Sequence, residues 1–135
     1  MTETTPQYPR PVTDADNHPF LNGWREGQLC LQHCRGCEMA VFYPRPLCPH
    51  CWSTDLEWRQ ASGRGTVVSY SRIFRPNHPA FNDEVPIVLA EIRLAEGAAL
   101  LARILEGDVK SGMEVVLMAS AGATERFPLP VFKPA

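Results

Sequence analysis

Residues 34–51 read CRGCEMAVFYPRPLCPHC and hold four of the chain's five cysteines. They form two Cys-x-x-Cys pairs, separated by ten residues: Cys34 with Cys37, and Cys48 with Cys51. A two-residue gap in a tight turn lets both thiolates point to one place, and a metal ion binds four such sulfurs at about 2.3 Å. The stretch between the pairs, with β-prone Val41–Tyr43 and then Pro44 and Pro46, turns the chain back. These residues therefore predict two turns that close on one tetrahedral site.

Whether these thiols bind a metal or form disulfides depends on the redox state of the cellular compartment. The N-terminal residues are polar and proline-rich, without the apolar segment of a secretory signal, and no apolar run approaches the ~20 residues of a membrane span. We therefore expect a cytoplasmic protein that does not enter a membrane. Disulfides do not persist in a reducing compartment, so paired Cys-x-x-Cys motifs there indicate a metal site.

Zinc is the favoured metal. All four positions are cysteine, so no position stays open for a substrate water, and closed four-cysteine sites are structural. Iron, held by the same ligands in a rubredoxin-like electron carrier, is the less favoured alternative. Buried thiols without a metal and a dithiol redox pair are further alternatives. We do not expect the neighbouring His33 and His50 to bind the metal. Cys30 is expected to act as a small buried apolar residue.

Composition narrows the class of partner. Thirteen Lys and Arg against fifteen Asp and Glu give a formal charge of −2, with 44% hydrophobic residues. A field of that size does not recruit nucleic acid or anionic membranes by bulk attraction. At 135 residues the chain is expected to form one domain, with or without a small appendage.

The chain before the cysteines is predicted to form a tail and a short helix. Residues 1–16 are expected to be a disordered N-terminal tail. Asp16 or Asn17 is a candidate N-cap, and Gly27 can end the helix. The helix would place three apolar residues on one face: Phe20, Leu21 and Trp24. That face is interpreted as covering the core, and an exposed surface for a partner is the alternative.

The chain after the cysteines alternates between strand and turn patterns. A strand is expected at 28–33 and another at 56–60. Five more are expected at 66–74, 87–94, 98–105, 113–118 and 128–132. In the first of these five, Val68, Tyr70 and Phe74 lie in phase on one face. The twelve-residue loop 75–86 follows the first of the five strands, which is typical of a five-stranded antiparallel OB-fold barrel. The predicted class is mainly β, with helix and zinc ribbon in 17–60 and the barrel in 61–135.

The order of these motifs resembles a known family. GWREGQL, the cysteine stretch, LEWRQASGRGTVVSYS and LLARI follow one another as in OB-fold proteins with an N-terminal rubredoxin-like zinc ribbon. That family was long catalogued as a domain of unknown function and is found beside thiolases. The resemblance covers roughly residues 18–134. It implies that the metal ligands are Cys34, Cys37, Cys48 and Cys51.

The resemblance also implies a function. Members look like non-catalytic, acyl-CoA-binding or scaffold subunits. They associate with thiolases, hotdog-fold enoyl-CoA hydratases, aldolases or acyltransferases of lipid, steroid or polyketide metabolism. A hetero-oligomer is therefore expected. The family often has glycine directly after the second cysteine of each pair, whereas Glu38 and Trp52 stand there in this chain, which predicts some backbone strain.

Residues for acyl-CoA binding are expected in the loop after the first barrel strand, where OB folds often hold ligands. Phosphates need Arg or Lys, and adenine needs an aromatic or apolar face. The candidate ligand-binding residues are Arg72, Arg75, Asn77, His78 and Phe81. In the alternative reading, the arginines form a solvated, ion-paired surface.

Two other functions are alternatives to the accessory subunit. A single-stranded nucleic-acid binder would use Tyr70, Phe74 and Phe81, but the charge is −2 and the chain has only Lys110 and Lys133. A rubredoxin-like electron carrier would show a coloured iron site. No histidine forms a recognisable pair with a nucleophile, so an accessory subunit is favoured over an enzyme.

Overall fold

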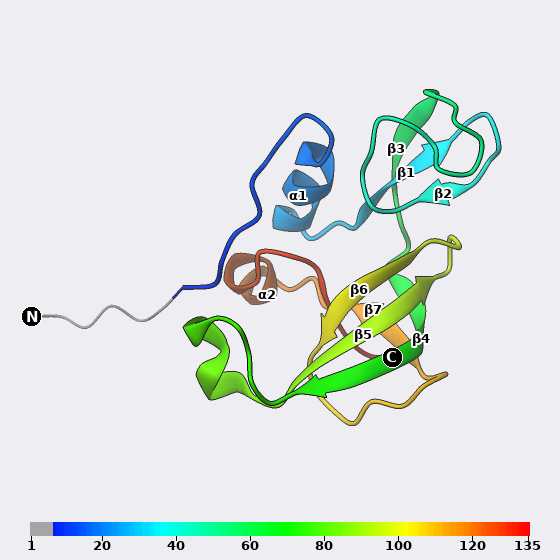
Figure 1. Cartoon of the computed structure of the whole chain (residues 1–135). Helices are drawn as coiled ribbons and strands as arrows, with labels where there is room; N and C mark the ends of the chain where they lie inside the picture. The colour runs from blue at the N-terminus through cyan, green and yellow to red at the C-terminus, as the bar shows by residue number, and fades with distance from the viewer. Residues whose placement is uncertain (1–6) are drawn as a thin grey trace, which may run out of the picture.

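The structure is a computed structural model that describes residues 7–135 (Figure 1). The predicted disorder of residues 1–16 falls in part on residues 1–6, which lie outside the described residues. Residues 7–14 have no regular secondary structure, and Tyr8 has defined contacts that are given below. The predicted boundaries at residues 16 and 60 stay predictions.

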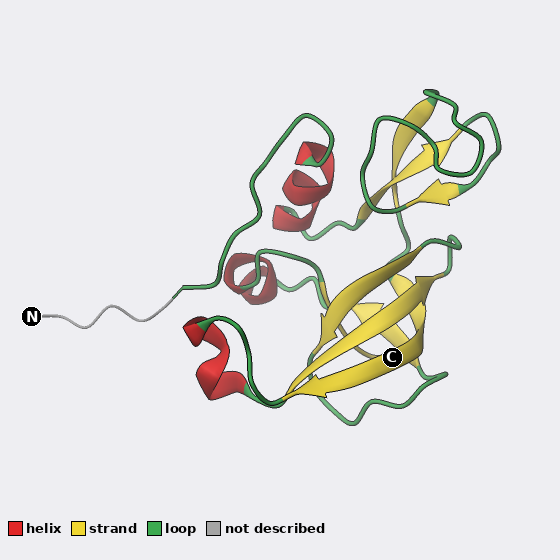
Figure 2. Cartoon of the chain, in the orientation of Figure 1, coloured by secondary structure: helices red, strands yellow, loops and turns green. Residues whose placement is uncertain are grey.

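A short helix, α1 (His18–Arg25), precedes the first sheet (Figure 2). Asn17 is at the N-cap position, and Gly27 (φ 81°) ends the helix with its N–H bonded to the Trp24 carbonyl at 2.9 Å. Phe20, Leu21 and Trp24 are all buried. The predicted core-covering face is confirmed, and the alternative of an exposed partner surface on this face is wrong.

The first sheet has the strand order β2-β1-β3 and is antiparallel. Its strands are β1 (Cys30–Cys34), β2 (Ala40–Val41) and β3 (Leu56–Gln60). β1 and β3 pair along their whole length, from Cys30 opposite Gln60 to Cys34 opposite Leu56. This pairing fixes the first cysteine turn at the end of a strand that is hydrogen-bonded on both sides.

The second sheet closes into a barrel with the order β4-β5-β6-β8-β7 (Figure 1). Its strands are β4 (Arg64–Ile73), β5 (Ile87–Leu94), β6 (Ala99–Ile104), β7 (Glu114–Leu117) and β8 (Val131–Pro134). The predicted mainly-β class, with a five-stranded OB-like barrel, is confirmed for the described residues. The expectation that all its strands are antiparallel is wrong, because β6 and β8 run parallel. A closed ring with an odd number of strands must contain at least one parallel pairing.

One core joins the barrel to the helix and the first sheet. Phe20 and Leu21 of α1 and Leu31 of β1 pack in the same buried cluster as Ile92 and Phe132 of the barrel. Burying such apolar side chains is the main favourable term in folding. The zinc-ribbon region is therefore packed on the barrel through α1 and β1.

Two short helices were not predicted. The 3₁₀-helix η1 (Pro79–Glu84) lies in the loop after β4, and α2 (Ala121–Arg126) lies between β7 and β8. In each case one side chain caps the first turn: His78 accepts from the Ala80 N–H, and Ser120 accepts from the Ala123 N–H. The Ser120 N-cap was a signal in the sequence that could have located α2. Among the described residues, no helix is long and apolar enough to cross a membrane.

Candidate metal centre

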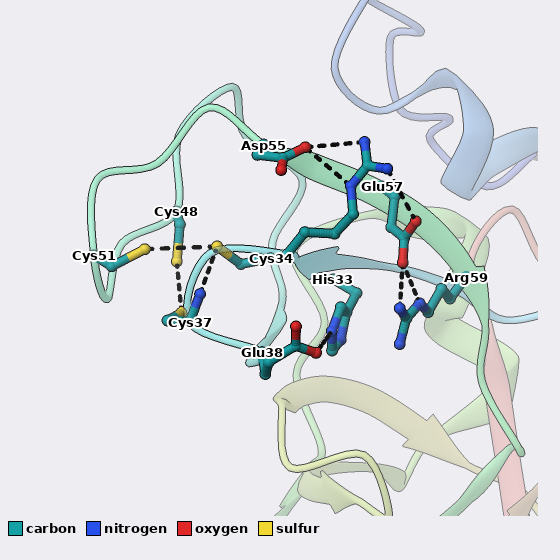
Figure 3. A network of polar contacts seen from close by, with 10 residues as sticks. His33, Cys34, Cys37, Glu38, Cys48, Cys51, Asp55, Glu57 and Arg59 are labelled. Carbon is teal, nitrogen blue, oxygen red and sulfur yellow. Dashed lines mark hydrogen bonds and ion pairs between the residues drawn. The ribbon is translucent and has the colours of Figure 1, made fainter.

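Two turns of the same construction present the four cysteines (Figure 3). In the first, the Glu38 N–H donates to the Cys34 carbonyl at 2.8 Å, and in the second the Trp52 N–H donates to the Cys48 carbonyl at 2.9 Å. Each turn thus brings its two cysteines to one side. The two turns face each other, so all four sulfurs converge.

The sulfur positions fit one tetrahedral ion. Cys34 Sγ lies 3.5 Å from Cys51 Sγ, and Cys37 Sγ lies 3.6 Å from Cys48 Sγ. All four sulfurs lie within 4.8 Å of one another. With metal–sulfur bonds of about 2.3 Å, the edge of a regular tetrahedron is about 3.8 Å, which lies within this range. The donor set and its spacing suit zinc or iron, and zinc is the typical ion of such a ribbon.

Backbone hydrogen bonds, burial and the neighbouring sulfurs shift the pKa values of two thiols in opposite directions. The Cys37 N–H points at Cys34 Sγ at 3.5 Å and is the main cause that lowers the pKa of Cys34 to about 7. The Met39 N–H acts to lower the pKa of Cys37, but burial and the neighbouring sulfurs outweigh it and raise that pKa to about 12. Four thiolates at this distance repel one another, and a bound divalent ion offsets that repulsion and replaces the protons.

The centre is closed toward the protein and open at one edge. Cys34 and Cys48 are fully buried among Val41 and Leu56, whereas Cys51 is exposed. The ion would be held by Cys34, Cys37, Cys48 and Cys51, and when bound it supplies a cross-link between the two turns. With four sulfur ligands it has no free position for a substrate, so the site is suited to structure.

The two histidines beside the cysteines are not in the ligand cluster. His33 Nε2 lies 2.9 Å from Glu38 Oε2, which directs the imidazole away from the sulfurs (Figure 3). On the other side, Arg35 bonds to Asp55 at 2.9 Å across the sheet. The exposed Arg35–Asp55 pair links the residue after β1 to the residue before β3 and is worth little by itself.

The backbone of the two turns is strained at the residue that directly follows the second cysteine of each pair. Glu38 has φ 63° and Trp52 has φ 66°, in the left-handed region that disfavours a Cβ. The positive φ angles of Glu38 and Trp52 thus agree with the backbone strain predicted at these two positions. It lies one residue after Cys37 and Cys51, so the metal turns themselves hold the residues in this conformation.

Replacing Trp52 with glycine is expected to raise the free energy of unfolding by about 1 kcal/mol, because left-handed backbone costs a non-glycine residue roughly 1–2 kcal/mol. Trp52 is 77% exposed, so little packing is lost. Thermal unfolding of the metal-loaded protein measures the change, expected as a rise in Tm of about 3–5 °C. Trp52→Ala, which keeps the Cβ, is the matched control and should not be stabilised. A glycine variant with a lower Tm than the alanine variant would contradict this account.

The predicted ligand-binding residues do not form one constellation. Arg75, Asn77 and Phe81 line a cavity of about 340 Å³ between the β4–β5 loop and residues 127–131. His78 instead caps η1, with Nδ1 3.1 Å from the Ala80 nitrogen. Arg72 is an exposed residue of β4 outside that cavity, and its Cζ lies 5.5 Å from the centroid of the Tyr70 ring. The structure thus brings three of the five residues together, and the role of all five stays a prediction.

A polar cluster at this cavity has no counterpart in the sequence patterns. The Tyr8 hydroxyl lies 2.6 and 2.5 Å from the two Glu84 oxygens, and Arg103 Nη1 lies 2.7 Å from Glu84 Oε1. Burial raises the pKa of Glu84, but the hydrogen bonds from Tyr8 and Arg103 outweigh it and hold that pKa below its usual value. Tyr8 and Glu84 are 76 residues apart, and no local pattern links them.

Two family models match this chain. The model of the ChsH2 rubredoxin-like zinc ribbon domain matches residues 21–57. The model of the ChsH2 C-terminal OB-fold domain matches residues 58–119. The two matches adjoin and together span most of the described chain, including all four clustered cysteines.

Individual relatives agree with the models. A Thermomonospora curvata protein named probable enoyl-CoA hydratase alpha subunit is 38% identical over 100% of this chain, which spans 43% of that protein's length. A DUF35 domain-containing scaffold protein of Methanocaldococcus jannaschii is 34% identical over 70% of this chain and 72% of its own length. In a solved structure, a chain of the Ltp2-ChsH2(DUF35) aldolase is 34% identical with a TM-score of 0.75, covering 93% of this chain and 98% of that one.

Proposed function

This chain belongs to the DUF35 family, in which a rubredoxin-like zinc ribbon precedes an OB-fold domain, and we propose that it is a non-catalytic scaffold subunit of an acyl-CoA-processing enzyme complex. The observation that carries the proposal is the likeness to the ChsH2 chain of an aldolase complex over 98% of that chain. The closed four-sulfur centre, which suits structure rather than catalysis, supports it.

The proposed partner is an enzyme that acts on an acyl-CoA. One relative bears the name of an enoyl-CoA hydratase subunit, and the structural neighbour is part of an aldolase. A hydratase of the hotdog fold or an aldolase is therefore the first choice of partner, and a thiolase-like enzyme is the further candidate from the sequence resemblance. In either case the assembly is a hetero-oligomer.

An apolar groove between α1, the ribbon and the barrel is the proposed partner surface. It encloses about 370 Å³ and is lined in part by Phe42, Tyr43, Leu101 and Leu129. Three of these are large apolar side chains at the surface: Tyr43 is 52%, Leu101 57% and Leu129 47% exposed. Contiguous exposed apolar residues of this kind mark interaction sites on soluble proteins.

Binding of an acyl-CoA by the barrel is the second part of the proposal. Arg75 and Asn77 at the rim of the 340 Å³ cavity supply donors for a polar group, and its apolar walls suit a hydrocarbon chain. Single-stranded nucleic acid is less well supported, because Phe81 already stacks with Tyr8 at 4.8 Å and Tyr70 is half-buried under Arg72.

Co-expression with the hydratase, aldolase and thiolase subunits of the same organism tests the scaffold role. We expect one of them to co-elute with the chain in a fixed ratio. Leu101→Asp should weaken that complex by roughly tenfold or more, as expected for loss of an apolar contact in an interface centre. Val68→Asp, at a 42% exposed position of β4 away from the groove, is the matched control. Turnover of an acyl-CoA by the isolated chain at an ordinary enzymatic rate would show that the accessory role is wrong.

A further inference from the structure

The chain's own N-terminal segment forms part of one wall of the 340 Å³ cavity beside the barrel. Most of its walls are apolar: Ile73, Ile87 and Leu89 come from β4 and β5, and Phe127, Leu129 and Val131 come from the connection before β8 and the start of β8. Its volume lies at the lower end of the range for small-molecule sites, which are concave and mostly apolar with few polar groups. Tyr8 also lines it, although it precedes every other lining residue by more than sixty positions.

Tyr8 is held there by its ring and its hydroxyl. The ring stacks with Phe81 at a centroid distance of 4.8 Å and with Phe127 at 5.7 Å, with interplanar angles of 15° and 14°. The hydroxyl bonds to Glu84, which closes the last turn of η1. The start of the described chain accordingly lies beside η1 and α2 (Figure 1).

Apart from Tyr8, residues 7–11 of this segment make few hydrogen bonds, whereas Val12 and Asp14 are bonded to Asn17. Gln7, Pro9 and Arg10 are exposed, and residues 7–14 have no regular structure. Among the described residues, the side-chain hydrogen bonds of positions 7–11 are those of Tyr8 with Glu84. A segment with few contacts and solvent-exposed backbone opens at low free energy compared with the core.

Opening would not leave a buried charge without a partner. Glu84 also lies 2.7 Å from Arg103 and 3.2 Å from Arg126, so it retains cationic partners if Tyr8 leaves, and water can then solvate the phenol. Breaking a buried interaction is most unfavourable when one partner stays buried and unpaired, and that does not occur here. The closed and open arrangements are therefore both chemically satisfied.

We propose that Tyr8 is a removable lid on this cavity, and that an acyl chain enters by displacing it. The inference rests on the proposed acyl-CoA binding. It adds that the Tyr8 side chain competes with the acyl chain for the same part of the cavity. A ligand that binds only the open arrangement has its apparent affinity reduced by the open fraction. The lid thus lowers the affinity of the free subunit for acyl chains.

Isothermal titration of the full chain with octanoyl-CoA tests the lid, with coenzyme A lacking an acyl group as the reference ligand. Removing the competing ring in Tyr8→Ala is expected to tighten octanoyl-CoA binding by roughly tenfold. Tyr8→Phe, which keeps the stacking and loses the hydroxyl, is expected to fall between this variant and the wild type. Leu89→Arg fills the cavity and should abolish binding, both alone and when combined with Tyr8→Ala.

Fluorine NMR of protein labelled with 3-fluorotyrosine gives an independent readout, because the chain has three tyrosines and single Tyr→Phe variants assign them. Octanoyl-CoA is expected to move the Tyr8 signal to the position of a solvent-exposed ring. Equal affinity of wild type and Tyr8→Ala, with an unmoved Tyr8 signal and binding still sensitive to Leu89→Arg, overturns the lid and leaves the proposed function intact. Weaker binding by a folded Tyr8→Ala or Tyr8→Phe overturns it too. No binding by any variant overturns both the lid and the acyl-CoA part of the proposed function.

Discussion

Replacing Cys34 with serine is expected to release the metal from the purified chain and to unfold the zinc ribbon. Cys34 ends β1 and is fully buried among the sulfurs, so a hydroxyl there cannot complete a four-sulfur site. Structural zinc sites contribute apparent free energies of about 10–16 kcal/mol, comparable with or larger than the total stability of a domain. β2 spans only Ala40–Val41, and so short a strand cannot hold the ribbon together without the ion.

Elemental analysis of freshly isolated, reduced protein measures the effect, and circular dichroism follows the structure. We expect one zinc ion per wild-type chain and none for Cys34→Ser. Cys30→Ser is the matched control, because Cys30 lies outside the sulfur cluster and should leave the zinc content unchanged. An absorption spectrum distinguishes zinc, which is colourless, from iron. Wild-type protein without any transition metal would contradict the metal centre itself.

Replacing Trp24 with alanine is expected to lower the free energy of unfolding by about 3–5 kcal/mol, the range for truncating a buried large aromatic side chain. Trp24 is 1% exposed, and its indole N–H donates to the Phe127 carbonyl at 2.8 Å. Its ring packs with Ala123, Phe127 and Val131. The substitution therefore leaves a cavity where α1 packs against α2 and the start of β8.

Chemical denaturation followed by circular dichroism measures the loss, provided that the metal content is the same in both proteins. Trp24→Phe retains most of the ring and should lose less, chiefly the hydrogen bond and the volume of the indole. Trp52→Ala removes an indole that is 77% exposed and should change the stability by less than about 0.5 kcal/mol. Equal losses for Trp24→Ala and Trp52→Ala would contradict the packing described for α1.

The clustering of the four cysteines could be predicted because its signal is local. Cysteine is rare, its spacing is fixed by the turn, and both pairs lie within eighteen residues of sequence. The same holds for α1, where the apolar period and Gly27 define a face and an end. The strain at Glu38 and Trp52 could be expected from the family resemblance, because the position after each pair is where a glycine is often found.

Other features depend on contacts that no short window contains. Val68, Tyr70 and Phe74 are in phase, but a bulge between Val67 and Ser69 shifts the register, so Val67 is 1% exposed and Val68 42%. A bulge adds one residue to one strand. Because Val67 and Val68 are adjacent and equally apolar, the sequence does not indicate which of them faces inward. The parallel β6–β8 pairing follows from closure of the whole ring, not from either strand.

The acyl-CoA residues were chosen by loop position and residue type, and the structure shows the limit of that choice. Arg75, Asn77 and Phe81 lie in the loop after β4 and in η1, which together form one side of the cavity. His78 is used by the helix cap. The remaining groups at the cavity come from β4, β5, β6, residues 127–131 and the N-terminal segment. Only the tertiary fold brings Tyr8, Glu84 and Arg103 together.

The position of β8 sets the order in which the two sheets can be completed during synthesis. β8 is the strand that joins β6 to β7, and Phe132 on it is fully buried. On the ribosome, the barrel cannot close before residues 131–134 have emerged, whereas β1, β2, β3 and all four clustered cysteines are complete by residue 60. The nascent chain can therefore present all four sulfurs to an ion while the barrel strands still have open edges.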